Sequence, residues 1–154
     1  MIVLVECYHD VALVCALGVP TSALRHERGK GNILNRLRNA TDIATGLLDA
    51  DPGAYPPAQM QNYREKQNSH GLRLLMHAQD ERRRIVEINP RLEEWLVARA
   101  DASRVKLVEY SLPERAYDIH RSARCDQKPG FSRFLAALLA VDEGMKTLKK
   151  WLTE

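Results

Sequence analysis

The segment Ile2-Val3-Leu4-Val5-Glu6 sets the class of the fold, because its apolar and β-branched residues run unbroken up to the glutamate. Such a run is typical of a strand that is buried on both faces in a parallel sheet. Asp10 is expected to cap a buried helix over Val11 to Leu17, and Gly18 followed by Pro20 would end that helix. A strand followed by a helix and a stop signal predicts the beginning of a βαβ unit.

The next segments repeat this alternation. A short strand is expected at Ala23 to His26, and a loop follows it. The apolar residues after the loop recur at helical spacing and predict a helix with one buried face, made of Ile33, Leu34, Leu37 and Ala40. A third strand is expected at Ile43 to Leu48, and Pro52 with Gly53 forces a turn soon after it.

The rest of the chain changes from mixed to mainly helical. Many turn-forming residues between Pro52 and Ser69 predict an excursion over the sheet edge, with a short helix at Gln59 to Lys66. Strands are expected at Leu72 to His77 and Ile85 to Ile88, with a charged turn at Asp80 to Arg84 between them. Helices are expected at four further places: Pro90 to about Ala102, Glu114 to Arg121, Phe131 to about Val141, and a terminal piece ending in Trp151.

These elements together predict an α/β fold with a parallel-rich central sheet flanked by helices. We expect one domain over residues 1–154, in which residues 103–154 form a mainly helical C-terminal extension.

Composition excludes several other classes of protein. The chain has 154 residues, 45% of them hydrophobic and 28% charged, with a net charge of +3, as in ordinary globular proteins. No window reaches the roughly 18 apolar residues of a membrane span, and the first residues lack the basic flank of a signal peptide. Three cysteines without a CxxC pair favour reduced thiols over a disulfide framework. We therefore expect a cytoplasmic protein, and the mild positive charge permits contact with nucleic acid.

Acidic residues follow two of the predicted strands. Glu6 ends the first strand, and Asp49 and Asp51 follow the third. The carboxyl ends of parallel strands open on one edge of a sheet, so these carboxylates are expected to converge. Asp49 and Asp51 would face the same side if the strand geometry continued through Ala50. Oxygen ligands of this kind suit Mg²⁺ or Mn²⁺. The alternative is that Asp49 and Asp51 only begin a turn.

The segments Val3-Leu4-Val5-Glu6 and Gly46-Leu47-Leu48-Asp49-Ala50-Asp51, separated by two crossovers, resemble the TOPRIM domain of topoisomerases, primases, recombination proteins and OLD-family nucleases. The resemblance covers about the first third of the chain and implies a Rossmann-related fold. It also implies magnesium-dependent nuclease chemistry on DNA or RNA, with Glu6 as general acid/base or metal ligand and Asp49 and Asp51 as a metal pair.

Two further residues enter through the same resemblance. The segment Gly29-Lys30-Gly31-Asn32-Ile33 is similar to a lysine-containing loop of OLD-type domains, which implies that Lys30 contacts phosphate. Glu93 corresponds to a later acidic residue and would be a further metal ligand. From the residues alone, a plain loop leading into a helix is an equal alternative for the segment around Lys30.

Two other function classes remain open. Cys7 stands where TOPRIM sequences usually have glycine, and no partner domain accompanies the module, which favours a catalytically inactive binding module. Such a module would contact nucleic acid or a protein, or pair its terminal helix with a second copy. A phosphoacceptor domain, with phosphate on Asp49 or Asp51, is the third alternative.

Other side chains have structural explanations. Cys7 and His9, with His26, lack the further ligands of a zinc site, so they are predicted to be core or solvated residues. Cys15 is predicted to be a small core residue, and both tryptophans to be core or oligomer contacts. A structural role is also favoured for Cys125, although nearby basic residues could lower its pKa. Basic residues would line a phosphate-binding surface only if the fold brought them together: Arg82, Arg83, Arg84, Arg121, Arg124, Lys128 and Arg133.

Overall fold

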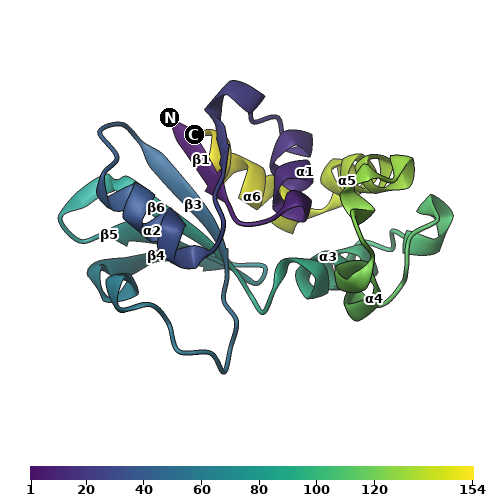
Figure 1. Cartoon of the computed structure of the whole chain (residues 1–154). Coiled ribbons are helices and arrows are strands. Elements are labelled where there is room, and N and C mark those ends of the chain that lie inside the picture. Colours follow the sequence, from purple (N-terminus) through teal and green to yellow (C-terminus); the bar gives the residue numbers. More distant parts are fainter.

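The computed structural model describes all of residues 1–154 as a six-stranded sheet with helices on both faces (Figure 1). The strand order is β2-β1-β3-β6-β5-β4. The first four of these strands are parallel to one another, and β5 pairs in antiparallel fashion with both β6 and β4. The main elements are β1 (Ile2–Val5), α1 (Tyr8–Ala16), β2 (Leu24–His26), α2 (Lys30–Arg38), β3 (Ala44–Asp49), β4 (Tyr63–Ser69), β5 (Leu72–His77), β6 (Asp80–Ile88), α3 (Leu92–Ala102), α4 (Ala116–Arg121), α5 (Pro129–Val141) and α6 (Glu143–Thr153). The predicted α/β fold with a parallel-rich sheet is confirmed.

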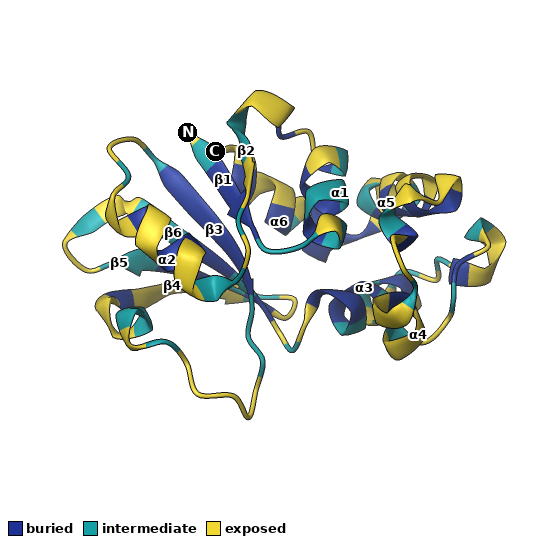
Figure 2. Ribbon diagram, in the orientation of Figure 1, coloured by how far each residue is buried: buried dark blue, intermediate teal, exposed yellow.

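The central strands are buried on both faces, as the unbroken apolar run at the N-terminus predicts (Figure 2). Leu4 belongs to a core of nine buried residues that α2 covers. Val3 and Val5 point to the opposite face and belong to a larger core of 27 buried residues. Gly46 lies in the middle of β3 because a Cβ atom there would come within 2.7 Å of the Ile33 side chain on α2.

The larger core joins the C-terminal helices to the sheet. Leu148, Trp151 and Leu152 of α6 are buried in the same cluster as residues of β1 and α1. The Trp151 indole also donates a hydrogen bond to the Gln67 side chain on β4, at 3.1 Å. The predicted burial of Trp95 and Trp151 is confirmed. Within the helical C-terminal third, α6 packs against β5 and β6, whereas α5 packs against α1 and α4 against α3. None of the helices combines the length and the apolar character needed to cross a membrane.

Two predictions in the middle of the chain are wrong. Where a helix was expected at Gln59 to Lys66, a short 3₁₀ helix at Ala58–Asn62 leads into the edge strand β4. This strand is polar and mostly exposed, since it pairs only with β5, so it lacks the apolar alternation by which strands are recognised. The segment Asp80 to Arg84 is the first half of β6, and the turn lies at residues 78–79.

The first helix begins earlier than expected. Cys7 is its N-cap, and the Cys7 sulfur accepts from the Asp10 backbone N–H at 3.5 Å. The Asp10 carboxylate accepts from the Cys7 backbone N–H at 3.0 Å, which completes a reciprocal capping box. Asp10 is therefore the third residue of the helix and not its cap.

Candidate functional site

The order of the first three strands creates a crevice at one end of the sheet. The chain passes from β1 to β2 through α1 on one face, and from β2 to β3 through α2 on the other. The carboxyl ends of β1 and β3 are therefore neighbours at a topological switch point, where open α/β sheets bind ligands. A cavity of about 390 Å³ lies here. Its lining comes from the segment after β1, the end of β3, the start of α3 and the segment from α4 to α5, and includes Glu6, Asp10, Asp49, Asp51, Glu93, His120 and Arg124.

Glu6 and Asp10 form the β1 side of the cavity. The buried Asp10 carboxylate accepts hydrogen bonds from the backbone N–H groups of Glu6, at 3.2 Å, and Cys7, at 3.0 Å. Burial raises the pKa of Asp10 in spite of these hydrogen bonds. Burial also raises the pKa of Glu6, whereas the nearby Lys30 charge opposes the increase. Both carboxyl groups thus hold their protons more tightly than they would in water.

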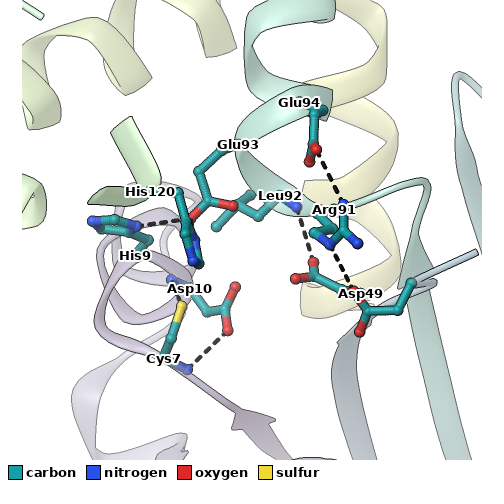
Figure 3. Close-up of polar contacts among 10 residues, drawn as sticks. Cys7, His9, Asp10, Asp49, Arg91, Leu92, Glu93, Glu94 and His120 are labelled. Carbon is teal, nitrogen blue, oxygen red and sulfur yellow. Dashed lines mark hydrogen bonds and ion pairs between the residues drawn. The ribbon is translucent and has the colours of Figure 1, made fainter. Parts of the chain in front are cut away.

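Asp49 is the last residue of β3, and its side chain points toward the first turn of α3 (Figure 3). Its Oδ1 atom accepts a hydrogen bond from the Leu92 backbone N–H at 2.9 Å. Burial, together with the charges of Asp10, Glu93 and Asp51, raises the pKa of Asp49 to about 8, although the Leu92 hydrogen bond opposes the increase. Asp49 is therefore largely protonated near neutral pH.

Asp51 lies apart from Asp49. The expected strand geometry does not continue through Ala50, because β3 ends at Asp49 and Asp51 has a left-handed backbone with φ of 48°. Its carboxylate accepts from Lys30 Nζ at 2.6 Å and from Arg91 Nε at 2.8 Å. Burial would raise the pKa of Asp51, but these two cations outweigh it and hold the pKa below its usual value. Lys30 thus reaches the site, as part of an ion pair.

Glu93 lies at the start of α3 between two histidines (Figure 3). Its Oε1 atom is 3.0 Å from His9 Nδ1 and 3.4 Å from His120 Nδ1. Burial of Glu93 would raise its pKa, but the contacts with both histidines lower it overall. The predicted residues Glu6, Asp49, Asp51, Glu93 and Lys30 all belong to this end of the sheet.

No three histidine, cysteine, aspartate or glutamate side chains lie close enough together to hold a metal ion in this arrangement. His26 contacts the Glu6 carbonyl oxygen at 3.0 Å and its ring packs against Tyr8, whereas His9 contacts Glu93. Burial raises the pKa values of the Cys7 and Cys125 thiols. The predicted burial of Cys15 is wrong, because its side chain faces solvent on α1.

The basic residues do not form one surface. Arg82 and Arg83 pair with Asp80 at the amino end of β6, at the opposite end of the sheet from the cavity. Arg124 lines the cavity itself.

Sequence reasoning missed His9, Asp10 and His120 as residues of this site. Asp10 was interpretable as an acidic group one helical turn beyond Glu6, whereas His120 comes from a distant helix and has no local signal.

Comparisons of the chain with protein-family models, with curated proteins and with solved structures give no match. The function of the chain is therefore inferred from the residues and geometry of the cavity.

Proposed function

We propose that this chain is a TOPRIM-like protein that binds Mg²⁺ or Mn²⁺ in the cavity and acts on phosphodiester bonds of DNA or RNA. One observation carries the proposal. Glu6 follows β1, Asp49 ends β3 and Glu93 follows β6, and these three adjacent parallel strands bring them to one cavity, together with Asp10. Carboxylates that share a partly buried cavity are costly to ionise in the absence of a cation or a shared proton.

The pKa values support a cation site at Asp49 in particular. Glu6, Asp10 and Asp49 all have raised pKa values, because burial disfavours their charged forms. A divalent cation would favour these charged forms, and carboxylate oxygens are the ligands that Mg²⁺ and Mn²⁺ prefer. Glu6 and Asp49 would hold the ion, with water completing its coordination. Asp51 would join them only after releasing Lys30 or Arg91, and Glu93 only after releasing His9.

When bound, the ion would polarise the phosphate and stabilise the leaving oxygen. Glu6 is suited to moving a proton, since its raised pKa lies nearer to neutral pH than that of an exposed glutamate. The Lys30 ammonium lies 2.6 Å from Asp51 and would exchange this partner for a phosphate oxygen. Asp51 then positions Lys30 before the substrate binds.

The first experiment is thermal unfolding with and without Mg²⁺ or Mn²⁺, followed by cleavage assays on labelled DNA and RNA. An ion at about 100 times its dissociation constant should stabilise the wild type by about 2.7 kcal/mol. The double variant Glu6→Gln with Asp49→Asn should lose this effect together with metal-dependent cleavage. Asp101→Asn is the matched control, because Asp101 is exposed at the end of α3 and does not line the cavity. Cleavage that persists in the double variant would contradict the proposal.

A second candidate function is a catalytically inactive binding module. It is favoured by the two cations on Asp51, which compensate its charge without a metal ion. Cys7 supports it as well, since its side chain occupies the helix N-cap next to the cavity. Nucleic-acid binding without any stabilisation by metal ions would favour this function over the enzyme.

A further inference from the structure

Two exposed tyrosines each lie beneath an arginine at the rim of the site. Tyr8, 46% exposed, has the Arg124 guanidinium 3.7 Å from its ring centroid. Tyr117, 60% exposed, has the Arg121 guanidinium 5.3 Å from its ring centroid. Most other aromatic side chains of the chain are buried, so exposed rings in this position require an explanation other than packing.

One tyrosine–arginine pair lines the acidic cavity, and the tyrosine of the other lines a cavity next to it. Tyr8 and Arg124 line the cavity of about 390 Å³. Tyr117 lines a neighbouring cavity of about 260 Å³, together with Arg91. Glu93 and His120 line both cavities, so Tyr8 and Tyr117 lie in adjoining cavities that share these two residues. A chain molecule that occupied both cavities would contact both tyrosines.

The first pair is held in place before any ligand binds. The Arg124 side chain donates two hydrogen bonds to the Asp126 carboxylate, at 3.1 and 3.0 Å, which fixes the plane of the guanidinium. The His26 ring packs edge-on against Tyr8 at 4.7 Å. Arg124 nevertheless remains 42% exposed. A flat group can therefore stack on it without rearranging the loop.

The second pair carries an available charge. Arg121 forms no ion pair in the structure, whereas Arg124 is neutralised by Asp126. The Arg121 guanidinium lies over the Tyr117 ring and has no carboxylate partner, so its outward N–H groups can contact a phosphate. Planar stacking surfaces combined with a free cation are what proteins use to hold unpaired bases and their backbone.

We propose that this rim binds single-stranded nucleic acid, with one base stacked on the Tyr8–Arg124 pair and another on the Tyr117–Arg121 pair. The inference deepens the proposed function, since it names the form of nucleic acid that would reach the acidic cavity. Unpaired bases fit because both of their faces are accessible, whereas the faces of bases in a duplex are already stacked. DNA and RNA share this chemistry.

The test is equilibrium binding of fluorescently labelled short oligonucleotides, measured by anisotropy in EDTA so that binding is separated from metal-dependent cleavage. Oligo-dT, oligo-U and a duplex of the same length are compared. Tyr8→Leu and Tyr117→Leu should each weaken single-strand binding about tenfold, in line with measured losses of base stacking. Arg121→Gln should reduce the slope of log affinity against log salt by about 0.7, the value for one phosphate contact of a single strand.

Tyr55→Leu is the matched control, because Tyr55 is fully exposed in the loop after β3 and has no arginine over its ring. It should bind as the wild type does. The three tyrosine side chains lie largely at the surface, so all three variants should unfold within a few degrees of the wild type. Absence of binding, tighter binding of the duplex, or unchanged affinity in both rim variants would overturn the inference. Single-strand binding without cleavage in Mg²⁺ would support it and contradict only the proposed enzyme.

Discussion

Replacing Asp49 with asparagine tests the electrostatics of the cavity most directly. The variant retains a side-chain oxygen that can accept from the Leu92 N–H, but it cannot ionise. Burial and the neighbouring carboxylates raise the pKa of Asp49 from 3.8 to about 8. Between these values the folded protein keeps a proton that the unfolded chain has released. The contribution of Asp49 to stability is therefore lost as the pH rises from the unfolded pKa toward the folded one.

The magnitude follows from about 1.4 kcal/mol for each pH unit in this interval. The full interval sets an upper limit of roughly 5 to 6 kcal/mol for the stability that Asp49 loses. Water in the open cavity screens the charge and makes the actual loss smaller. We expect the wild type to lose about 2 to 4 kcal/mol relative to Asp49→Asn between about pH 5 and about pH 8. Asn at this position should thus be stabilising at the higher pH.

Urea unfolding in EDTA, monitored by far-ultraviolet circular dichroism across this pH range, measures the difference. Saturating Mg²⁺ at the higher pH should restore the wild type, because it binds the ionised carboxylate, and should do little for the variant. A difference between the two proteins that stays constant with pH would refute the reasoning. So would a wild type that gains stability relative to the variant as the pH rises.

Three further predictions concern the rest of the fold. Asp142→Ala should destabilise the protein by about 3 to 5 kcal/mol, because it leaves the Arg99 guanidinium without its buried partner. Gly130→Ala should reduce the melting temperature sharply, since its Cβ would collide with the Tyr110 carbonyl oxygen. Maleimide should modify the exposed Cys15 in the native protein, whereas the buried Cys125 should react only after unfolding.

The two substitutions each have a control variant. Glu143→Gln alters an exposed acidic residue next to Asp142 and should change stability by less than about 0.5 kcal/mol. Gly31→Ala places a Cβ in open space on α2 and should stabilise the helix by about 0.5 to 1 kcal/mol. Melting curves measure these effects, and mass spectrometry identifies the labelled cysteine. Equal effects of the two glycine variants, or native labelling of Cys125, would contradict the packing described above.

The sequence predicts the first half of the fold well, because the patterns that indicate β1, α2 and β3 are short-range. The apolar run before Glu6 and the helical spacing from Ile33 to Leu37 depend only on neighbours in the chain. The polar strand β4 could not be predicted in this way. It exists because its backbone pairs with β5 at the sheet edge, and its side chains remain mostly exposed.

The convergence of acidic residues was predictable from strand ends, whereas their partners were not. The Lys30–Asp51 pair depends on how α2 lies over the sheet, and the His9–Glu93 pair joins residues 84 positions apart. Asp51 also turns away from Asp49 because its backbone is left-handed, a conformation that the aspartate tolerates. Local sequence therefore identifies the carboxylates, and tertiary structure decides which of them receive a basic side chain as partner.

Because only Asp51 has basic partners, substitutions of Asp49 and Asp51 are predicted to have opposite effects on the stability of the protein. Asp51 has two cationic partners and a lowered pKa, so Asp51→Asn should destabilise the protein near neutral pH, by about 1 kcal/mol for a half-exposed pair. Asp49 accepts one backbone hydrogen bond and has a raised pKa, so Asp49→Asn should stabilise it under the same conditions. Urea unfolding of both variants in EDTA measures the two signs. If both substitutions shift stability in the same direction, the distinction between a compensated and an uncompensated carboxylate is wrong, and with it the reason for placing a cation at Asp49.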